Sequence, residues 1–399
     1  MFQGKKMTKS HFLLGDIYRE LGKDEEAIIN YNKAIELNPK NFEAYLSKGI
    51  CLHKLTKFEE AIEAYDKILA LKPDYLGAFV NKGNALQELE RYSEAIENYD
   101  AAISIQPDSN YVYFNKGNAL ISLEKYQEAI EIFDKVISKN PMNCELYISK
   151  GVSLSKLEKH EEAIYNFNTA LTLKPDCSNA YFHLANSLRE LEKYEESLKY
   201  YEKAIEFEES EDADFYCGKG IVLHLLGKLE DALESFNKAI LIKPDFFVAY
   251  YKKLMILEDL GKNEEAVENY NLVIGMVPDD PDLYVNKGNA LHELGKYEEA
   301  IETYSKAIEL SPDDADVYIN RGTSLYVLKR YEEAILDFDK AMELDSNVAD
   351  IYYNKGNCLH RLEKYNEAIE NYDKAITLRP DYEEAKTNKK ISLDSLFPC

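Results

Sequence analysis

Asparagines recur along this sequence at intervals of 34 residues, often as pairs three residues apart. The set comprises Asn81 and Asn84, Asn115 and Asn118, Asn286 and Asn289, Asn320, and Asn354 and Asn357. An asparagine side chain carries both hydrogen-bond donors and an acceptor. A row of such amides on one surface can bind the backbone of an extended peptide without reading its side chains. These nine residues are the candidate peptide-binding site.

Four histidines also recur at multiples of 34 residues or one residue more. They suggest a metal site, because zinc favours imidazole ligands. They are His53, His224, His292 and His360. The last three follow one another at two intervals, about 20 Å if stacked helices lie about 10 Å apart. A zinc–nitrogen bond is only about 2 Å long. The sequence therefore predicts no metal ion and no other cofactor, and we expect these imidazoles to face solvent or a ligand.

Residues for catalysis do not come together in any recognisable arrangement. No grouping of Ser, His and Asp, or of Cys and His, stands out from the repeated pattern. The sequence Gly218-Lys219-Gly220 lacks the strand-to-helix context of a phosphate-binding loop. The six cysteines show no CxxC spacing, which is typical of a reducing compartment. We expect a protein that is not an enzyme and that resides in the cytoplasm.

The 34-residue interval organises nearly the whole chain. When the recurrent glycine is numbered as position 8, eleven units begin at residues 8, 42, 76, 110, 144, 178, 213, 247, 281, 315 and 349, with one residue inserted near Ser210. Tyr or Phe occupies position 24 in every unit, Ala occupies position 20 in ten, and nine of the eleven prolines occupy position 32. Apolar residues recur at helical spacing in two stretches of each unit. Two antiparallel helices per unit follow, joined by a turn that carries Gly-Lys or a substitute.

This pattern resembles the tetratricopeptide repeat, which has an aromatic residue at position 4, Gly at 8, Ala at 20, an aromatic residue at 24 and Pro at 32. The resemblance implies an all-α, right-handed α-solenoid of about eleven helix-turn-helix repeats. It also implies that the first helices of the repeats line a concave binding face. The asparagine row resembles the one in the superhelix of O-linked N-acetylglucosamine transferase.

The frame divides the chain into three parts. Residues 1–7 are expected to be a leader that includes residues left over from cloning, with Met7 as an internal start. Residues 8–382 form the superhelix, and residues 383–399 form a polar capping helix and tail, with the twelfth helix itself expected at Asp381 to Leu396.

Two repeats depart from the pattern. Repeat 6 has Glu209 in place of Pro and carries the inserted residue, whereas repeat 8 has Leu254 in place of the position-8 glycine. The leucine predicts a wider crossing between the two helices of repeat 8. The region from repeat 6 to repeat 8 is therefore either a hinge or a locally repacked but rigid stretch.

Two further rows follow the frame. Position 7 carries Lys or Arg in nine units, and their long stems favour a structural role over ligand binding. Position 5 is apolar throughout, and we expect large side chains such as Phe114, Phe182, Tyr251 and Tyr353 to be partly exposed. Such side chains can act as anchors for a ligand between the asparagines.

The charge balance narrows the class of partner. The chain has a net charge of −25, which repels nucleic acid and favours a soluble monomer. It has no run of 18 apolar residues, which argues against membrane insertion. We expect a non-enzymatic scaffold that binds extended peptide segments of partner proteins. Three alternatives stay open: a detached substrate-recruiting arm of an enzyme complex, a spacer without a peptide ligand, and asparagines that only solvate the groove.

Overall fold

The computed structural model describes residues 2–208 and 211–396. Within those ranges the chain forms 23 α-helices and no strand, which confirms the all-α solenoid of helical repeats. The helices divide into two compact units, Met1–Ser210 and Glu211–Cys399. The division falls at the predicted insertion, although Glu209 and Ser210 themselves lie outside the described residues. None of the described helices is long and apolar enough to cross a membrane.

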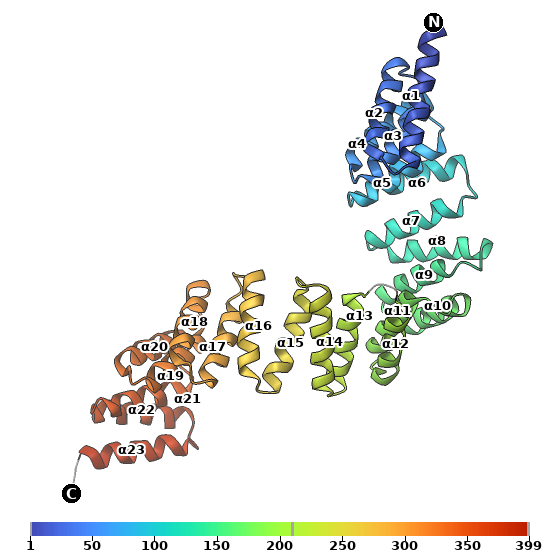
Figure 1. Ribbon diagram of the computed structural model, residues 1–399. Helices are drawn as coiled ribbons and strands as arrows, with labels where there is room; N and C mark the ends of the chain where they lie inside the picture. Colours follow the sequence, from blue (N-terminus) through green and yellow to red (C-terminus); the bar gives the residue numbers. More distant parts are fainter. Residues whose placement is uncertain (1, 209–210, 397–399) are drawn as a thin grey trace. The chain divides into compact units, whose positions relative to one another are not determined.

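The first unit consists of six helical hairpins, one per repeat, in which consecutive helices lie side by side (Figure 1). Its helices are α1 (Phe2–Glu20), α2 (Asp24–Leu37), α3 (Phe42–Lys54), α4 (Phe58–Leu71), α5 (Leu76–Glu88), α6 (Tyr92–Ile105), α7 (Asn110–Ser122), α8 (Tyr126–Lys139), α9 (Cys144–Lys156), α10 (His160–Leu173), α11 (Ser178–Glu190) and α12 (Tyr194–Glu206). From α3 on, each odd-numbered helix begins at a predicted repeat start. The exception is α1, which begins at Phe2 and so includes residues that the sequence assigned to a leader.

The second unit contains five further hairpins and a single terminal helix (Figure 1). Its helices are α13 (Ala213–Leu225), α14 (Leu229–Ile242), α15 (Phe247–Asp259), α16 (Asn263–Met276), α17 (Pro281–Glu293), α18 (Tyr297–Leu310), α19 (Ala315–Val327), α20 (Tyr331–Leu344), α21 (Ala349–Arg361), α22 (Tyr365–Leu378) and α23 (Glu383–Leu396). The five first helices again begin at the predicted starts. The terminal helix begins at Glu383, two residues later than expected.

The turn between the two helices of every repeat places position 15 in the left-handed backbone region. Four of these residues are glycines: Gly22, Gly227, Gly261 and Gly295. The other seven are Thr56, Glu90, Glu124, Glu158, Glu192, Lys329 and Glu363, with φ between 57° and 61°. The turn is closed by a bond from the position-16 N–H to the position-11 carbonyl, such as that from Arg91 to Leu86 at 2.9 Å. This is the left-handed helix ending that the Gly-Lys pattern predicts.

The core of a repeat is built on a contact between helix backbone and aromatic ring. In nine repeats the position-24 ring lies against the position-8 glycine, so closely that an added Cβ atom would fall 2.4 to 2.8 Å from a ring carbon. Gly83 with Tyr99 and Gly117 with Phe133 are examples, at 2.6 Å each. Both rings are fully buried. Glycine gives the ring this space, and a side chain at position 8 requires the ring or the second helix to shift.

Aromatic residues at position 4 join each repeat to the one before it. The hydroxyls of Tyr181, Tyr284 and Tyr318 donate to the carbonyls of Pro175, Pro278 and Pro312, at 3.0 to 3.1 Å. Each of these prolines occupies position 32 of the preceding repeat. Tyrosine suits this position, because its ring packs and its hydroxyl holds the loop.

Cations at position 7 also join neighbouring repeats, which supports the structural role expected for them. Their ammonium groups lie 2.5 to 2.6 Å from a carboxylate at position 25 of the preceding repeat. The pairs are Lys82 with Asp66, Lys116 with Asp100, Lys150 with Asp134, Lys355 with Asp339, and Lys389 with Asp373. The lysine stems are mostly covered while the carboxylates are about half exposed, so each pair contributes at most about 1 kcal/mol.

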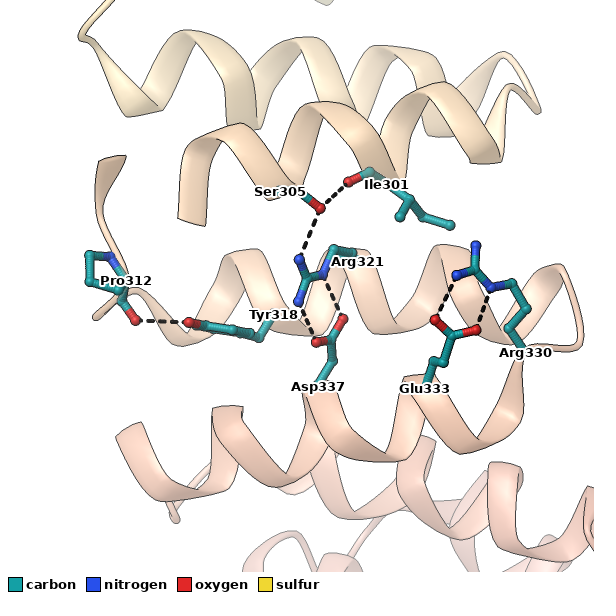
Figure 2. A network of polar contacts seen from close by, with 8 residues as sticks. All are labelled: Ile301, Ser305, Pro312, Tyr318, Arg321, Arg330, Glu333 and Asp337. Carbon is teal, nitrogen blue, oxygen red and sulfur yellow. Dashed lines mark hydrogen bonds and ion pairs between the residues drawn. The ribbon is translucent and has the colours of Figure 1, made fainter. Parts of the chain in front are cut away.

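Arg321 is a variation on this junction, shown in Figure 2. Position 25 of the preceding repeat is Ser305, and Arg321 Nη1 donates to its hydroxyl at 2.9 Å. The same guanidinium donates two bonds, at 2.8 and 2.6 Å, to the carboxylate of Asp337 in α20. Asp337 is buried, and an unpaired buried carboxylate would lower the stability of the fold. The bidentate pair with Arg321 compensates that charge.

The glutamates with positive φ at position 15 allow a test of how backbone strain in the turn affects stability. In a variant with Glu90, Glu124, Glu158 and Glu192 all changed to Gly, we expect higher stability of the first unit, by about 0.5 to 1 kcal/mol per site. The reason is that glycine adopts positive φ without the steric cost that a Cβ atom brings. Thermal unfolding followed by circular dichroism measures the effect. Alanine at the same four sites is the control, since it removes the carboxylates and keeps the strain; equal melting of the two variants would contradict the explanation.

Candidate functional site

Three of the predicted asparagines at position 9 are acceptors that hold repeats together. Asn84 Oδ1 accepts from the Tyr99 hydroxyl at 2.8 Å and from Asn115 Nδ2 at 2.9 Å. The same arrangement recurs in two other sets: Asn289 with Tyr304 and Asn320, and Asn357 with Tyr372 and Asn388. We call these three sets the amide clamps. Each clamp joins the two helices of one repeat to the first helix of the next.

The other predicted asparagines are not in clamps. Burial, together with Glu258, raises the pKa of the Tyr270 hydroxyl, and the nearby Asn286 amide opposes that rise. The side chains of Asn81, Asn118 and Asn354 form no hydrogen bond with any residue in the described ranges. Their amides therefore remain open to a ligand or to water.

The composition of the neighbouring repeat explains why Asn118 is unpaired. Position 24 of its own repeat is Phe133, which has no hydroxyl, and position 6 of the next repeat is Ser149. A clamp needs a tyrosine at position 24 and an amide at position 6 of the following repeat. Sequence analysis missed Asn186, whose oxygen accepts from Tyr201 at 2.6 Å, and Asn388 in α23. They occupy positions 9 and 6 of the repeat numbering, the same positions as the predicted asparagines, so the sequence pattern could have identified both.

Three of the four predicted histidines, which occupy position 12 of their repeats, take part in contacts between repeats, whereas the His53 ring lies edge-on to Phe58 of its own repeat. Nδ1 of His292 lies 2.8 Å from Ser324 Oγ, and Nδ1 of His360 lies 2.8 Å from Ser392 Oγ. His224 lies 3.7 Å from the carboxylate of Asp259. Among the described residues no group of three or more His, Cys, Asp or Glu side chains is arranged to hold a metal ion. Position 12 is therefore a packing position in these repeats.

Two cavities open on the first-helix face of repeats 5 and 6, where α9 and α11 supply most of the lining. Their volumes are about 980 and 790 Å³, and His183 lines both. Ser149 and Phe207 line the larger one, whereas Val152 and Asn186 line the smaller. A third cavity of about 260 Å³ lies in the second unit beside one amide clamp. The pair on repeats 5 and 6 is large enough for several side chains of an extended segment.

His183 separates the two larger cavities as a neutral, mostly enclosed ring. It stacks on Phe167 with ring centres 5.8 Å apart and lies edge-on to Phe182 at 5.3 Å. Burial, assisted by the charge of Lys156, lowers the pKa of the imidazole from 6.5 to about 4. The ring is therefore uncharged at neutral pH and behaves as an aromatic surface with polar edges.

The two cavities differ in charge. Around the larger one stand four carboxylates and one ammonium group: Glu145, Asp176, Glu206, Glu208 and Lys174. The smaller is balanced, with Lys156 and Arg189 opposite Glu158 and Glu190. The guanidinium of Arg189 is already engaged, since it donates to Glu190 at 2.7 Å and to the Tyr201 hydroxyl at 3.3 Å. The surface thus runs from an acidic end to a neutral one.

The cavities lie where the asparagine row is interrupted. The predicted asparagines lie on repeats 3 and 4 and on repeats 9 to 11, whereas Ser149 and His183 replace asparagine at position 6 of repeats 5 and 6. The interruption itself was the available signal, because a clamp cannot form there. Large side chains at position 5 are partly exposed as expected, with Phe182 half-buried and Tyr251 48% exposed.

A stack of 34-residue helical hairpins with ligand-sized cavities on its first-helix face defines a class of repeat scaffold. Sequence models described as tetratricopeptide repeat match residues 42–75, 315–348 and 349–382, residues 80–142, and residues 176–244. A model described as TPR repeat matches residues 15–56, 256–295 and 288–328. The chain belongs to the tetratricopeptide repeat family. Residues 122–204 also match a model of subunit 3 of the anaphase-promoting complex, or cyclosome.

Three solved structures are similar to this chain, and the first of them shows the same fold. A tetratricopeptide repeat protein from Parabacteroides merdae ATCC 43184 is 18% identical, with a TM-score of 0.55 over 63% of this chain and 99% of that one. YrrB, described as a TPR protein with an unusual peptide-binding site, is 26% identical, with a TM-score of 0.42 over 49% of this chain and 97% of its own. Yeast Tom70 is 17% identical, with a TM-score of 0.37 over 98% and 96% of the two chains. No curated protein matches the sequence.

Clamped and unclamped asparagines should respond differently to removal. We expect Asn84→Ala to lower the free energy of unfolding by about 1 to 2 kcal/mol, because the Asn115 amide loses its acceptor and the Tyr99 hydroxyl keeps only Gln87 as one. Asn118→Ala should change it by less than about 0.5 kcal/mol, since no bond is lost. Urea denaturation of the two variants measures the difference. Equal effects would show that the clamp bonds do not contribute to stability.

His183 should make the first unit less stable in mild acid. Its folded-state pKa, about 4, lies below the usual 6.5, so between these values the unfolded chain binds the extra proton. Stability is therefore lost as pH falls from 6.5 towards 4, with a slope of at most about 1.4 kcal/mol per pH unit. His183→Phe keeps an aromatic ring at this site and removes the titration. We expect the stability of the wild type relative to this variant to fall over that window in urea denaturation; a pH-independent difference would refute the assignment.

Proposed function

We propose that this protein is a non-enzymatic scaffold that binds extended peptide segments of partner proteins on its first-helix face. The observation that carries the proposal is the pair of cavities sharing His183 on repeats 5 and 6. The two cavities lie on either side of His183 and both open to solvent, and we call them together the groove. An extended peptide can place side chains in two neighbouring cavities at once. The pair of cavities therefore suits a peptide better than a compact ligand.

The groove offers contacts to both backbone and side chains. Asn118, on the neighbouring repeat, has an amide that no described residue occupies and can bond a peptide group. Ile148, Val152 and Phe182 supply apolar surface, and apolar anchors provide most of the binding energy in such complexes. In this proposal the unpaired asparagines Asn81, Asn118 and Asn354 contact the ligand. The clamped ones act by keeping the repeats in register.

The charge around the larger cavity favours a particular kind of segment. Glu145, Asp176 and Glu206 outnumber Lys174, and the chain as a whole is strongly acidic. A lysine or arginine side chain therefore fits this end, with an apolar side chain next to it against His183. The same charge disfavours nucleic acid. We extend the proposal to a monomer in the cytoplasm.

Peptide binding can be tested by selecting ligands for the full chain from a random displayed library and measuring their affinity by fluorescence anisotropy. We expect the selected segments to contain Lys or Arg beside an apolar residue. Ser149→Trp, which fills the larger cavity, should weaken binding by about tenfold or more, because the anchor loses its space. Asn118→Ala should weaken it by a smaller factor.

Tyr165→Ala is the matched control, because Tyr165 is 72% exposed on the second-helix face of the same repeat. Circular dichroism confirms that all variants remain helical. Unchanged affinity in Ser149→Trp and Asn118→Ala would place any binding site elsewhere. A failure to select any peptide would instead favour the spacer, and a ligand drawn from the substrates of one enzyme would favour the recruiting arm.

A further inference from the structure

Repeat 8, formed by α15 and α16, lacks the backbone-to-ring contact that closes the other repeats of the second unit. Leu254 occupies position 8, where repeats 7, 9, 10 and 11 have a glycine beneath the aromatic ring. Leu254 and the Tyr270 ring are both buried, so they must share the space between the two helices. Accordingly, α15 and α16 are in less contact than the two helices of any other repeat. The wider crossing that the sequence predicted is confirmed.

The amide clamp is also missing from repeat 8. Met255 stands at position 9 and offers no acceptor, so the Tyr270 hydroxyl turns to the carboxylate of Glu258. Met255 is itself 38% exposed. Asn269 in α16 still donates to the Tyr250 carbonyl at 3.2 Å. That bond joins the two helices of the repeat, but it does not reach α17.

The ion pairs between repeats are missing on both sides of repeat 8. Lys253 and Lys287 occupy position 7 of repeats 8 and 9, but position 25 of the preceding repeat is Asn237 and Asn271 rather than aspartate. Neither lysine forms an ion pair with a residue that the structure describes. Burial lowers the pKa of both amines, and the more distant carboxylates of Glu265 and Glu268 near Lys253 and of Glu299 near Lys287 only partly oppose this.

The second helix of the repeat carries a further weak point near its carboxyl end. A Cβ atom added to Gly275 in α16 would meet nothing within 4 Å, so no neighbour requires a glycine there. Glycine in a helix costs up to about 1 kcal/mol relative to alanine. Four independent features of one repeat therefore lower its local stability.

We propose that repeat 8 is a joint within the second unit, at which α15 separates from α16 and repeat 7 moves relative to repeats 9 to 11. Local opening in a protein occurs where the buried contacts are fewest. Here the helix contact, the clamp and both flanking ion pairs are absent together, whereas repeat 9 has its glycine contact and its clamp. The joint lets the first-helix face of this unit adapt its shape. It does not depend on the peptide-binding proposal.

Hydrogen exchange of the full wild-type chain, followed by mass spectrometry, tests the joint directly. We expect amides of α15 and α16 to exchange about tenfold faster or more than those of α17 and α18, because they open locally. Repeat 9 is the internal reference, since its helices have the same lengths and similar sequences. Exchange in α15 and α16 as slow as in α17 and α18 would overturn the proposal.

Two repair variants test the cause. Asn237→Asp with Asn271→Asp supplies the missing carboxylates from exposed sites and leaves the core unchanged. Leu254→Gly with Met255→Asn restores the contact and the clamp acceptor in the core. We expect each variant to slow exchange in α15 and α16 by several fold.

Asn32→Asp is the matched control, because it makes the same change at position 25 of repeat 1, opposite Lys48. It should leave exchange in α15 and α16 unaltered. The surface repair keeps the test valid if the core variant does not fold. Wild-type exchange rates in the surface repair and in a folded core repair would overturn the proposed cause and with it the joint.

Discussion

The structure depends above all on the contact between a glycine backbone and an aromatic ring, which nine of the eleven repeats contain. With the ring seated where a Cβ atom would be, the two helices approach closely enough for small residues at position 20 to pack as well. That fixed spacing sets the surface on which the next repeat stacks. The tyrosine hydroxyl, the position-7 cation and the amide clamps can then reach their partners in neighbouring repeats. A solenoid is stabilised by such nearest-neighbour contacts. The distance between the two helices of one repeat therefore determines how the next repeat packs, and so on along each unit.

This dependence explains why the sequence predicted the fold so well. Ten first helices, from Phe42 to Ala349, begin at the expected residues, because glycine, aromatic residue and proline each have a separate steric reason to keep their position. The ends were less predictable. The amino-terminal helix starts at Phe2 and the last one at Glu383, since residues 2–7 precede the first position of the frame and Lys390 stands in α23 where the frame has glycine. The division after residue 210 coincides with an insertion, but a sequence does not state how far an insertion separates two stacks.

The candidate site was predicted less completely, for a physical reason. An asparagine in a row looks the same whether its oxygen is free or occupied, and the outcome depends on residues far away in the sequence. Asn84 is clamped because residue 99 is tyrosine and residue 115 is asparagine, whereas Asn118 faces Phe133 and Ser149. The cavities depend equally on what is missing, since the small Ser149 leaves space that a longer side chain would fill. Spacing therefore located the first-helix face, but it did not separate structural amides from available ones.

Stacking and binding thus compete for the same positions. An amide that joins two repeats cannot also serve a ligand with the same oxygen, and a ring that closes a hairpin leaves no cavity. Where the repeated pattern is interrupted, side chains lack their usual partners in the neighbouring repeat and are available to a ligand. At repeats 5 and 6 the loss of the clamp leaves a groove around a neutral His183, while the glycine contact at Gly151 still closes repeat 5. At repeat 8 the glycine contact is lost as well, so the repeat yields mobility rather than a rigid groove.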